Sequence, residues 1–117
     1  MVRNPRDYLP LTPAMFHVLL SIAGGPLHGY SILKDVAERT ANEVQLSTGT
    51  LYGLIKRLLD DELIVETATP AGDDERRRCY RLTEFGRQVA EAEAERLERL
   101  VLDARRRHLL RSEPSES

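Results

Sequence analysis

The sequence predicts a mainly α-helical fold with one small β-hairpin, and three observations support this prediction. Apolar residues recur at intervals of three and four in several separate stretches, which is the spacing of amphipathic helices. Ahead of the last stretch, two runs of strand-forming residues, 63–67 and 79–82, flank a group of turn residues at 70–74. The last helical stretch is the longest and follows this hairpin directly.

The length, charge and cysteine count of the chain limit the classes of function that it can have. The chain has 117 residues, enough for one domain with a modest core. Its formal net charge is −2, so any contact with nucleic acid must come from a local basic patch. Four arginines form such a patch within six positions: Arg76, Arg77, Arg78 and Arg81. The single cysteine excludes an intrachain disulfide, and no apolar run could cross a membrane, so we expect a cytoplasmic protein without membrane contact.

The first ten residues contain two prolines, and we expect an extended arm over 1–10. Thr12 and Pro13 then provide a capping hydroxyl and a proline at the first helical position. The helix that follows is apolar nearly all round and should be the buried helix of the domain. Gly24, Gly25 and Pro26 are expected to end it.

The second helix is predicted over 27–40. Its apolar face is formed by residues spaced at three and four, namely Tyr30, Leu33, Val36 and Ala37. His28, near its start, is expected to pack or cap rather than to serve as a ligand or base, since the other histidines lie in different segments. Residues 42–46 link this helix to the third, and the alternation at 44–46 leaves a very short strand open there.

The third helix begins after Ser47, a good N-cap residue. One face is an apolar stripe consisting of Leu51, Leu54, Ile55, Leu58 and Leu59. The opposite face has no bulky apolar side chain and includes Gly49, Gly53 and Lys56, so the helix could approach a nucleic-acid groove closely. An ordinary amphipathic helix with a solvated face would show the same pattern.

The order of the elements favours a third helix that approaches nucleic acid over an ordinary amphipathic helix. Two helices, a short link and a capped helix with a lean outer face match a helix-turn-helix. A hairpin placed after three helices is the winged-helix arrangement. The arginines of the basic patch lie on its return strand, where a wing would meet a phosphate backbone or the minor groove.

Thr83 is expected to cap the final helix, which runs from Glu84 to about Leu110 and would be roughly 40 Å long. Glutamates crowd its first half, and Arg105, Arg106 and Arg107 crowd its end. A core of this size cannot bury so long a helix, so we expect its apolar stripe to meet a second chain. The predicted dimerisation residues on this stripe are Ala90, Leu97, Leu100, Val101 and Ala104.

Four segments resemble the PadR family of transcriptional regulators, in the short form with one C-terminal helix. They are LHGYSI at 27–32, LSTGTLYGLIKRL at 46–58, ELI at 62–64 and RRCYRLTEFG at 77–86. The resemblance implies a winged helix-turn-helix over 11–83 and a C-terminal dimerisation helix over 84–111. It also implies a homodimeric repressor that binds an inverted-repeat operator in double-stranded DNA. Residues 112–117 are low in complexity and are expected to form a frayed tail.

The family pattern assigns DNA contacts to the third helix and to the wing. The matching residues in this sequence are Ser47, Thr48, Thr50, Tyr52, Lys56, Arg57, Arg77 and Arg78. The resemblance also suggests an apolar small-molecule effector at the dimer seam, near the first and last helices. No cofactor or metal is expected.

Three features depart from the family pattern. Glu62 stands where the family often has glycine, so we expect the third helix to end without an inexpensive left-handed cap. Asp73, Asp74 and Glu75 make the wing tip acidic, which argues against a deep phosphate contact there. The chain has no tryptophan, so relatives that bind flat aromatic drugs through tryptophan are a poor guide to its ligand.

Other classes of function fit the sequence less well. An enzyme is not expected, because the sequence has no nucleophile paired with a histidine in a known motif, no phosphate-binding loop and no metal-spaced cluster. Cys79 could be a redox switch, since arginines nearby would lower its pKa, but a structural cysteine is favoured. The main rival is a winged-helix protein-interaction module without DNA binding, which the near-neutral charge and the acidic wing tip favour.

Overall fold

The computed structural model describes residues 3–67 and 78–111 of the chain. It is mostly helical with a small antiparallel sheet, which confirms the predicted winged helix-turn-helix. The elements in chain order are η1 (Pro5–Tyr8), α1 (Pro13–Ala23), β1 (Leu27–His28), α2 (Gly29–Arg39), α3 (Thr48–Asp60), β2 (Ile64–Thr67), β3 (Cys79–Leu82) and α4 (Glu84–Arg106).

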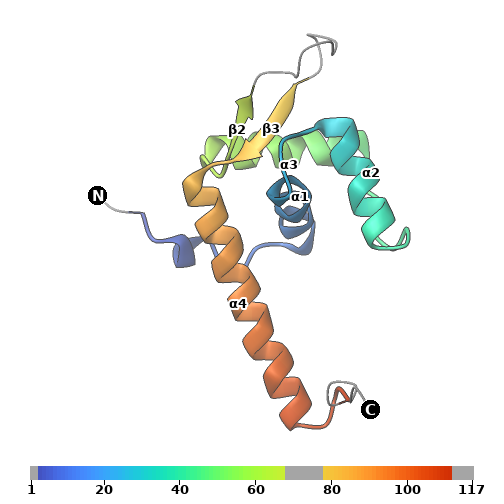
Figure 1. Cartoon of the computed structure of the whole chain (residues 1–117), viewed down its shortest axis with the longest axis vertical. Helices are drawn as coiled ribbons and strands as arrows, with labels where there is room; N and C mark the ends of the chain where they lie inside the picture. The colour runs from blue at the N-terminus through green and yellow to red at the C-terminus, as the bar shows by residue number, and fades with distance from the viewer. Residues whose placement is uncertain (1–2, 68–77, 112–117) are drawn as a thin grey trace.

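Helix α1 lies at the centre of the fold, with α2 and α4 on its two sides (Figure 1). Val18, Leu19 and Ile22 of α1 are buried and join side chains from the other helices in one hydrophobic core. The prediction that this is the buried helix of the domain is only partly correct, because Leu20 remains 41% exposed. That side chain lies on the side of α1 next to α4.

The sheet has three strands in the order β1-β3-β2. The hairpin of β2 and β3 was predicted, but the pairing of Leu27 with Tyr80 and of His28 with Cys79 was not. The second helix therefore begins at Gly29 rather than at residue 27. Local spacing could not reveal β1, because its pairing partner β3 lies about fifty residues further along the chain.

Each predicted capping hydroxyl is in place. Thr12, Ser47 and Thr83 accept hydrogen bonds from the backbone N–H three residues later, over 3.2, 3.1 and 2.9 Å. These bonds satisfy donors that the first turn of a helix leaves unpaired. At the other end of α1, the chain turns at the predicted glycines, where Gly25 adopts a φ of 143°.

The end of α3 corrects the expectation for Glu62. This residue does adopt the left-handed conformation, with a φ of 61°, although it is not glycine. The N–H of Glu62 bonds to the carbonyl of Leu59 over 3.0 Å, and the N–H of Leu63 bonds to that of Leu58 over 2.9 Å. This is a Schellman motif, and the burial of Leu58 and Leu63 offsets the strain at Glu62.

Three further predictions were wrong. The arm is not extended, because it contains η1 and packs beside α4 (Figure 1). Tyr30 faces outward with 69% exposure, because the buried stripe of α2 runs through Gly29, Ile32 and Val36 instead. The very short strand that was left open at 44–46 is not formed. Helix α4 ends at Arg106, and a left-handed residue, His108, follows shortly after it.

Candidate nucleic-acid interface

Helix α3 turns its apolar stripe inward and its polar face outward. Leu51, Ile55 and Leu58 are buried in the core. The predicted contact residues of this helix are all exposed: Thr48, Thr50, Tyr52, Lys56 and Arg57, with Ser47 exposed at the cap. A Cβ added at Gly49 or Gly53 would meet no atom within 4 Å, so both glycines open onto solvent. The outer face is therefore lean enough for a close approach to a groove.

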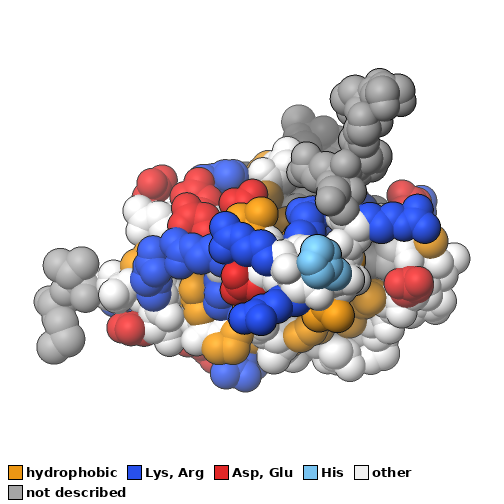
Figure 2. All heavy atoms as spheres, turned by 90° about the horizontal axis from the view of Figure 1, so that it is seen from below, with side chains coloured by type: hydrophobic (Ala, Val, Ile, Leu, Met, Phe, Trp, Pro, Cys, Tyr) orange, Lys and Arg blue, Asp and Glu red, His pale blue; other side chains and the backbone are white. Residues whose placement is uncertain are grey.

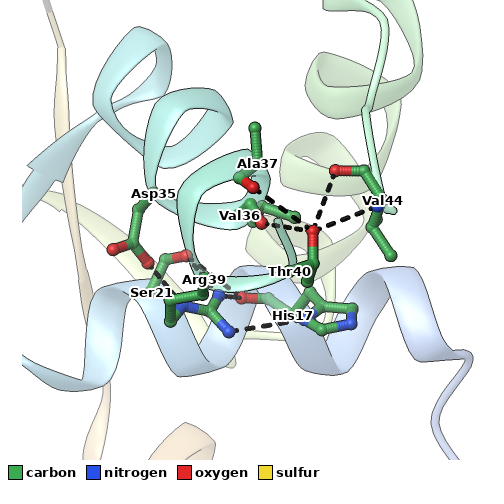
Figure 3. Close-up of polar contacts among 8 residues, drawn as sticks. All are labelled: His17, Ser21, Asp35, Val36, Ala37, Arg39, Thr40 and Val44. Carbon is green, nitrogen blue, oxygen red and sulfur yellow. Dashed lines mark hydrogen bonds and ion pairs between the residues drawn. The ribbon is translucent and has the colours of Figure 1, made fainter. Parts of the chain in front are cut away.

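A polar network fastens α2 to α1 (Figure 3). Arg39 of α2 donates to the carbonyl of His17 over 3.0 Å and to the hydroxyl of Ser21 over 2.9 Å, both on α1. Its Nε also donates to Asp35 over 2.8 Å. The carboxylate of Asp35 accepts hydrogen bonds from Arg39 and from Ser21. These bonds, and that from Arg39 most, hold the pKa of Asp35 below its ordinary value.

The hydroxyl of Thr40 fixes the turn between α2 and α3. It donates to the carbonyl of Val36 over 2.8 Å and accepts the N–H of Val44 over 3.0 Å (Figure 3). Ala41 and Asn42, between them in the chain, are left-handed with φ of 50° and 66°. The turn is thus closed by the side chain of the C-cap residue of α2, and the chain leads from it to Ser47 at the start of α3.

Two candidate residues also have local structural roles. Ser47 caps α3 and donates from its hydroxyl to Thr50 Oγ1 over 2.9 Å, so its oxygen is already engaged. Tyr52 is 47% exposed, and its hydroxyl lies so close to Gly29 that a Cβ there would be 2.5 Å away. Gly29 therefore allows α3 and the start of α2 to come together.

Lys56 keeps its freedom to reach a ligand. It pairs with Asp60 over 3.2 Å, but its side chain remains 79% exposed. An exposed pair of this kind contributes little to stability, so the ammonium group can turn to a phosphate at small cost. Arg57 is exposed beside it.

The wing is described only at its base. Arg78, the residue before β3, is exposed and pairs with Glu66 of β2 over 3.1 Å. Arg76, Arg77 and the acidic residues Asp73, Asp74 and Glu75 lie outside the described residues.

Cys79 is buried, with Sγ 3.3 Å from Nδ1 of His28 on the neighbouring strand. His28 makes no side-chain cap to α2, so it packs against the sheet rather than capping the helix.

Sequence reasoning missed one exposed aromatic residue near this face. Tyr30 is the second residue of α2, and Gly29 before it touches Tyr52. In a helix-turn-helix, the helix that precedes the recognition helix crosses the nucleic-acid backbone. The spacing of Ile32 and Val36, which both lie on the buried face of α2, was the signal that would have placed Tyr30 on the outer face.

A second surface runs along α1 and α4. Leu100 is 52% exposed and Val101 37% exposed, while Ala90, Leu97 and Ala104 are half-buried. Above them, α1 and α4 enclose a groove of about 150 Å³. Its apolar lining comes mainly from Phe16, Leu19, Leu20, Ala23, Leu82, Ala90 and Ala94.

The described residues contain no group of three or more His, Cys, Asp or Glu side chains that could hold a metal ion. Within the same part of the chain, no helix is both long and apolar enough to cross a membrane.

Comparison with known proteins identifies the family. Residues 18–92 match the model of the transcriptional regulator PadR-like family. This chain belongs to the PadR-like family. It is 36% identical over 87 residues to an uncharacterised 37.1 kDa protein of a Streptomyces fradiae transposon. That match covers 74% of this chain but only 24% of the relative, so the chain spans about a quarter of that protein's length.

Solved PadR structures share the fold. A PadR-family regulator from Clostridium difficile superimposes with a TM-score of 0.69 at 25% identity, over 79% of this chain and 94% of that one. Bacillus subtilis PadR, solved in complex with operator DNA, gives a TM-score of 0.61 at 22% identity, over 92% of this chain and 53% of that one.

One glycine of the fourth PadR-like segment is essential for packing. A Cβ at Gly86 would stand 1.8 Å from the carbonyl oxygen of Leu63, so no other residue fits there. Close by, the hydroxyl of Thr83 donates to the carbonyl of Glu62 over 2.7 Å. The first turn of α4 is therefore pressed directly against the segment that joins α3 to β2.

Proposed function

We propose that this PadR-like regulator is a homodimeric repressor that binds an inverted-repeat operator in double-stranded DNA and is released by an effector. The observation that supports this most is the exposed outer face of α3, which presents two glycines and several donors on a firmly held helix. Such a helix suits the major groove. A protein that acts on DNA in this way would work in the cytoplasm.

The DNA contacts divide between α3 and the wing. Thr50, Tyr52 and Lys56 are best placed for base edges and nearby phosphates, with Ser47, Thr48 and Arg57 at the margins. Arg78, together with Arg77, would act through phosphates or a narrow minor groove. The operator complex of Bacillus subtilis PadR supports a DNA partner for this chain.

The dimer would form through α4. The second half of this helix projects beyond the other helices (Figure 1), and its exposed Leu100 and Val101 have no apolar cover within the described chain. The stripe through Ala90, Leu97 and Val101 continues into the groove beside α1. A second copy of the chain would cover both surfaces at once.

Charge favours an antiparallel arrangement of the two α4 helices. Glu91 and Glu95 are exposed in the first half of α4, and arginines gather around its end (Figure 2). Parallel helices would set acidic halves side by side and basic ends side by side. Antiparallel helices would place the glutamates of one chain near Arg105 and Arg106 of the other.

An effector would bind at this seam. The α1–α4 groove is mainly apolar and lies where the partner chain would close it, which suits an apolar small molecule. A ligand there would act by changing how α4 meets its partner, and hence the spacing of the two α3 helices.

The decisive experiment is a gel shift of the purified protein with the region upstream of its own gene, against a scrambled duplex of equal length and composition. A repressor dimer should bind the upstream duplex more tightly, in steps that fit one dimer for each inverted repeat. Equal weak binding to both duplexes would contradict the proposal and favour the protein-interaction module.

A further inference from the structure

The side chain of Arg3 connects the arm to the end of α3. Its guanidinium donates to the carbonyl of Asp61, the C-cap residue of α3, and to the Glu62 carboxylate over 3.2 Å. The last carbonyls of a helix carry partial negative charge, so a cation is favourable there. Arg3 thus contacts the recognition helix at the end furthest from Ser47.

The same guanidinium also contacts α4 and η1. It lies over the ring of Phe85, the second residue of α4, at 4.2 Å from the ring centroid. Two of its nitrogens donate to the Tyr8 hydroxyl over 3.1 and 2.6 Å, and the Tyr8 ring meets Phe85 edge-on. One planar cation therefore joins three elements, a role that the guanidinium suits better than an ammonium group.

The arm is anchored at its other end as well. Following η1, the N–H of Leu11 donates to the buried carboxylate of Glu93 in the middle of α4 over 2.9 Å. The arm lies against α4 between these two anchors. The arm thus forms a strap along α4, and the side chain of Arg3 reaches from it to the end of α3.

The backbone conformation of Glu62 supports a specific role for its ion pair with Arg3. A left-handed backbone is strained for a residue with a side chain, and glycine at this position would avoid that strain. A glycine would also remove the carboxylate that accepts from Arg3. The side chain that causes the strain is thus the one that Arg3 binds.

We propose that Arg3 is a positioning residue that sets the angle of α3 relative to α4. This inference rests on the proposed function, because in a dimer that angle determines the distance between the two recognition helices. Operator half-sites are read at a fixed spacing, so an accurate angle gives discrimination between spacings. Arg3 itself touches no DNA in this proposal.

The test compares Arg3→Ala with Arg6→Ala, a control that removes the same charge from the same arm. Arg6 is exposed and lies against α4 near Arg96 and Arg99, away from α3. The first measurement is amide hydrogen exchange in the full-length protein without DNA. We expect faster exchange at Asp61, Glu62 and Leu63 in Arg3→Ala only. Equal exchange in the two variants at these amides would overturn the proposal.

The second measurement is binding to operators whose half-site spacing is native or changed by one base pair. The ratio of the two affinities should fall about fivefold in Arg3→Ala, because cation–π and dipole contacts each change an equilibrium by a few-fold. Arg6→Ala should keep the wild-type ratio, and Arg3→Lys should restore part of it.

The outcomes separate this inference from the proposed function. A uniform loss of affinity with a flatter salt dependence in Arg3→Ala would mean a phosphate contact and would overturn the positioning role. If the wild-type protein bound no operator, the proposed function would fail, and the positioning role in DNA binding would fail with it. Hydrogen exchange would then still decide whether Arg3 holds the end of α3.

Discussion

The backbone N–H of Leu11 donates a hydrogen bond of 2.9 Å to the carboxylate of Glu93, whose side chain is almost fully buried in the middle of α4. Arg96, one turn further along α4, donates to both carboxylate oxygens. The charge of Glu93 is therefore compensated on both sides, which explains how a glutamate can lie inside a small domain.

Replacing Glu93 with alanine should lower the free energy of unfolding by about 2 kcal/mol, since it leaves the Leu11 N–H unpaired and a void beneath the arm. Chemical denaturation measures this. The control is Glu95→Ala, an exposed glutamate on the same helix that should change stability by less than about 0.5 kcal/mol. Equal effects of the two variants would mean that the arm is not held by Glu93.

Stability should also depend on pH through Glu93. The hydrogen bond from Arg96, and then that from Leu11, hold the pKa of Glu93 below its ordinary 4.5. A depressed pKa in the folded state gives stability that is present above the unfolded pKa and is lost as pH falls through the folded value. Unfolding free energies measured from pH 7 to pH 3 should therefore decline below about pH 4.5, and Glu93→Gln should flatten that decline.

Gly53→Ala should separate stability from DNA binding. A methyl group there meets no protein atom, so the helix should gain about 0.5–1 kcal/mol of stability. If the outer face of α3 enters a groove, the same methyl should weaken operator binding. Gly24→Ala, also unobstructed but at the end of α1, should leave the affinity unchanged. Unchanged affinity in Gly53→Ala would exclude close contact at this face.

The wing arginines should determine the salt dependence of binding. Removing one arginine–phosphate interaction should reduce the magnitude of the slope of log K against log salt by roughly 0.9. The double variant Arg77→Ala with Arg78→Ala should therefore weaken operator and scrambled duplex alike and flatten the slope. Glu66→Gln should act in the opposite direction, because it releases Arg78 from its ion pair. A wild-type slope in the double variant would exclude the wing as electrostatic anchor.

Replacing Leu97 and Val101 with glutamate should leave a monomer or an unfolded chain, because charges would enter the apolar stripe of α4. Light scattering measures the mass of the particle and so distinguishes a monomer from a dimer.

Charge reversals test whether the two α4 helices are antiparallel. Glu91→Arg or Arg105→Glu alone should weaken the dimer roughly tenfold at low salt, and the two together should restore it. Tighter dimers in the single variants would indicate parallel helices instead.

Features set by neighbouring residues could be predicted from the sequence. The capping hydroxyls of Thr12, Ser47 and Thr83 each bond to a residue three positions later, so these caps can be recognised from a few consecutive residues of the sequence. The inward stripe of α3 also followed from spacing alone. The same spacing left its outer face exposed, and whether that face binds DNA stays a prediction.

Features that depend on distant partners were missed. Leu27 and His28 form a strand because β3 lies beside them, so α2 starts later than predicted. The sequence did not distinguish Glu93 from the other glutamates of the last helix, because its partner Leu11 is far away in the chain. The role of Arg3 likewise depends on its contacts with Glu62 and Phe85, which are distant in the chain. Hydrophobic periodicity contains no information about such pairs.

The two-residue strand β1 has a consequence for the thermodynamics of association. It bonds the return strand of the wing to the residue immediately before α2, while Tyr52 packs on the next residue, Gly29. The base of the wing, the start of α2 and α3 are thus already in contact with one another in the chain alone. If these contacts persist in a complex, these segments need no mutual ordering on binding, so more of the contact energy remains as affinity.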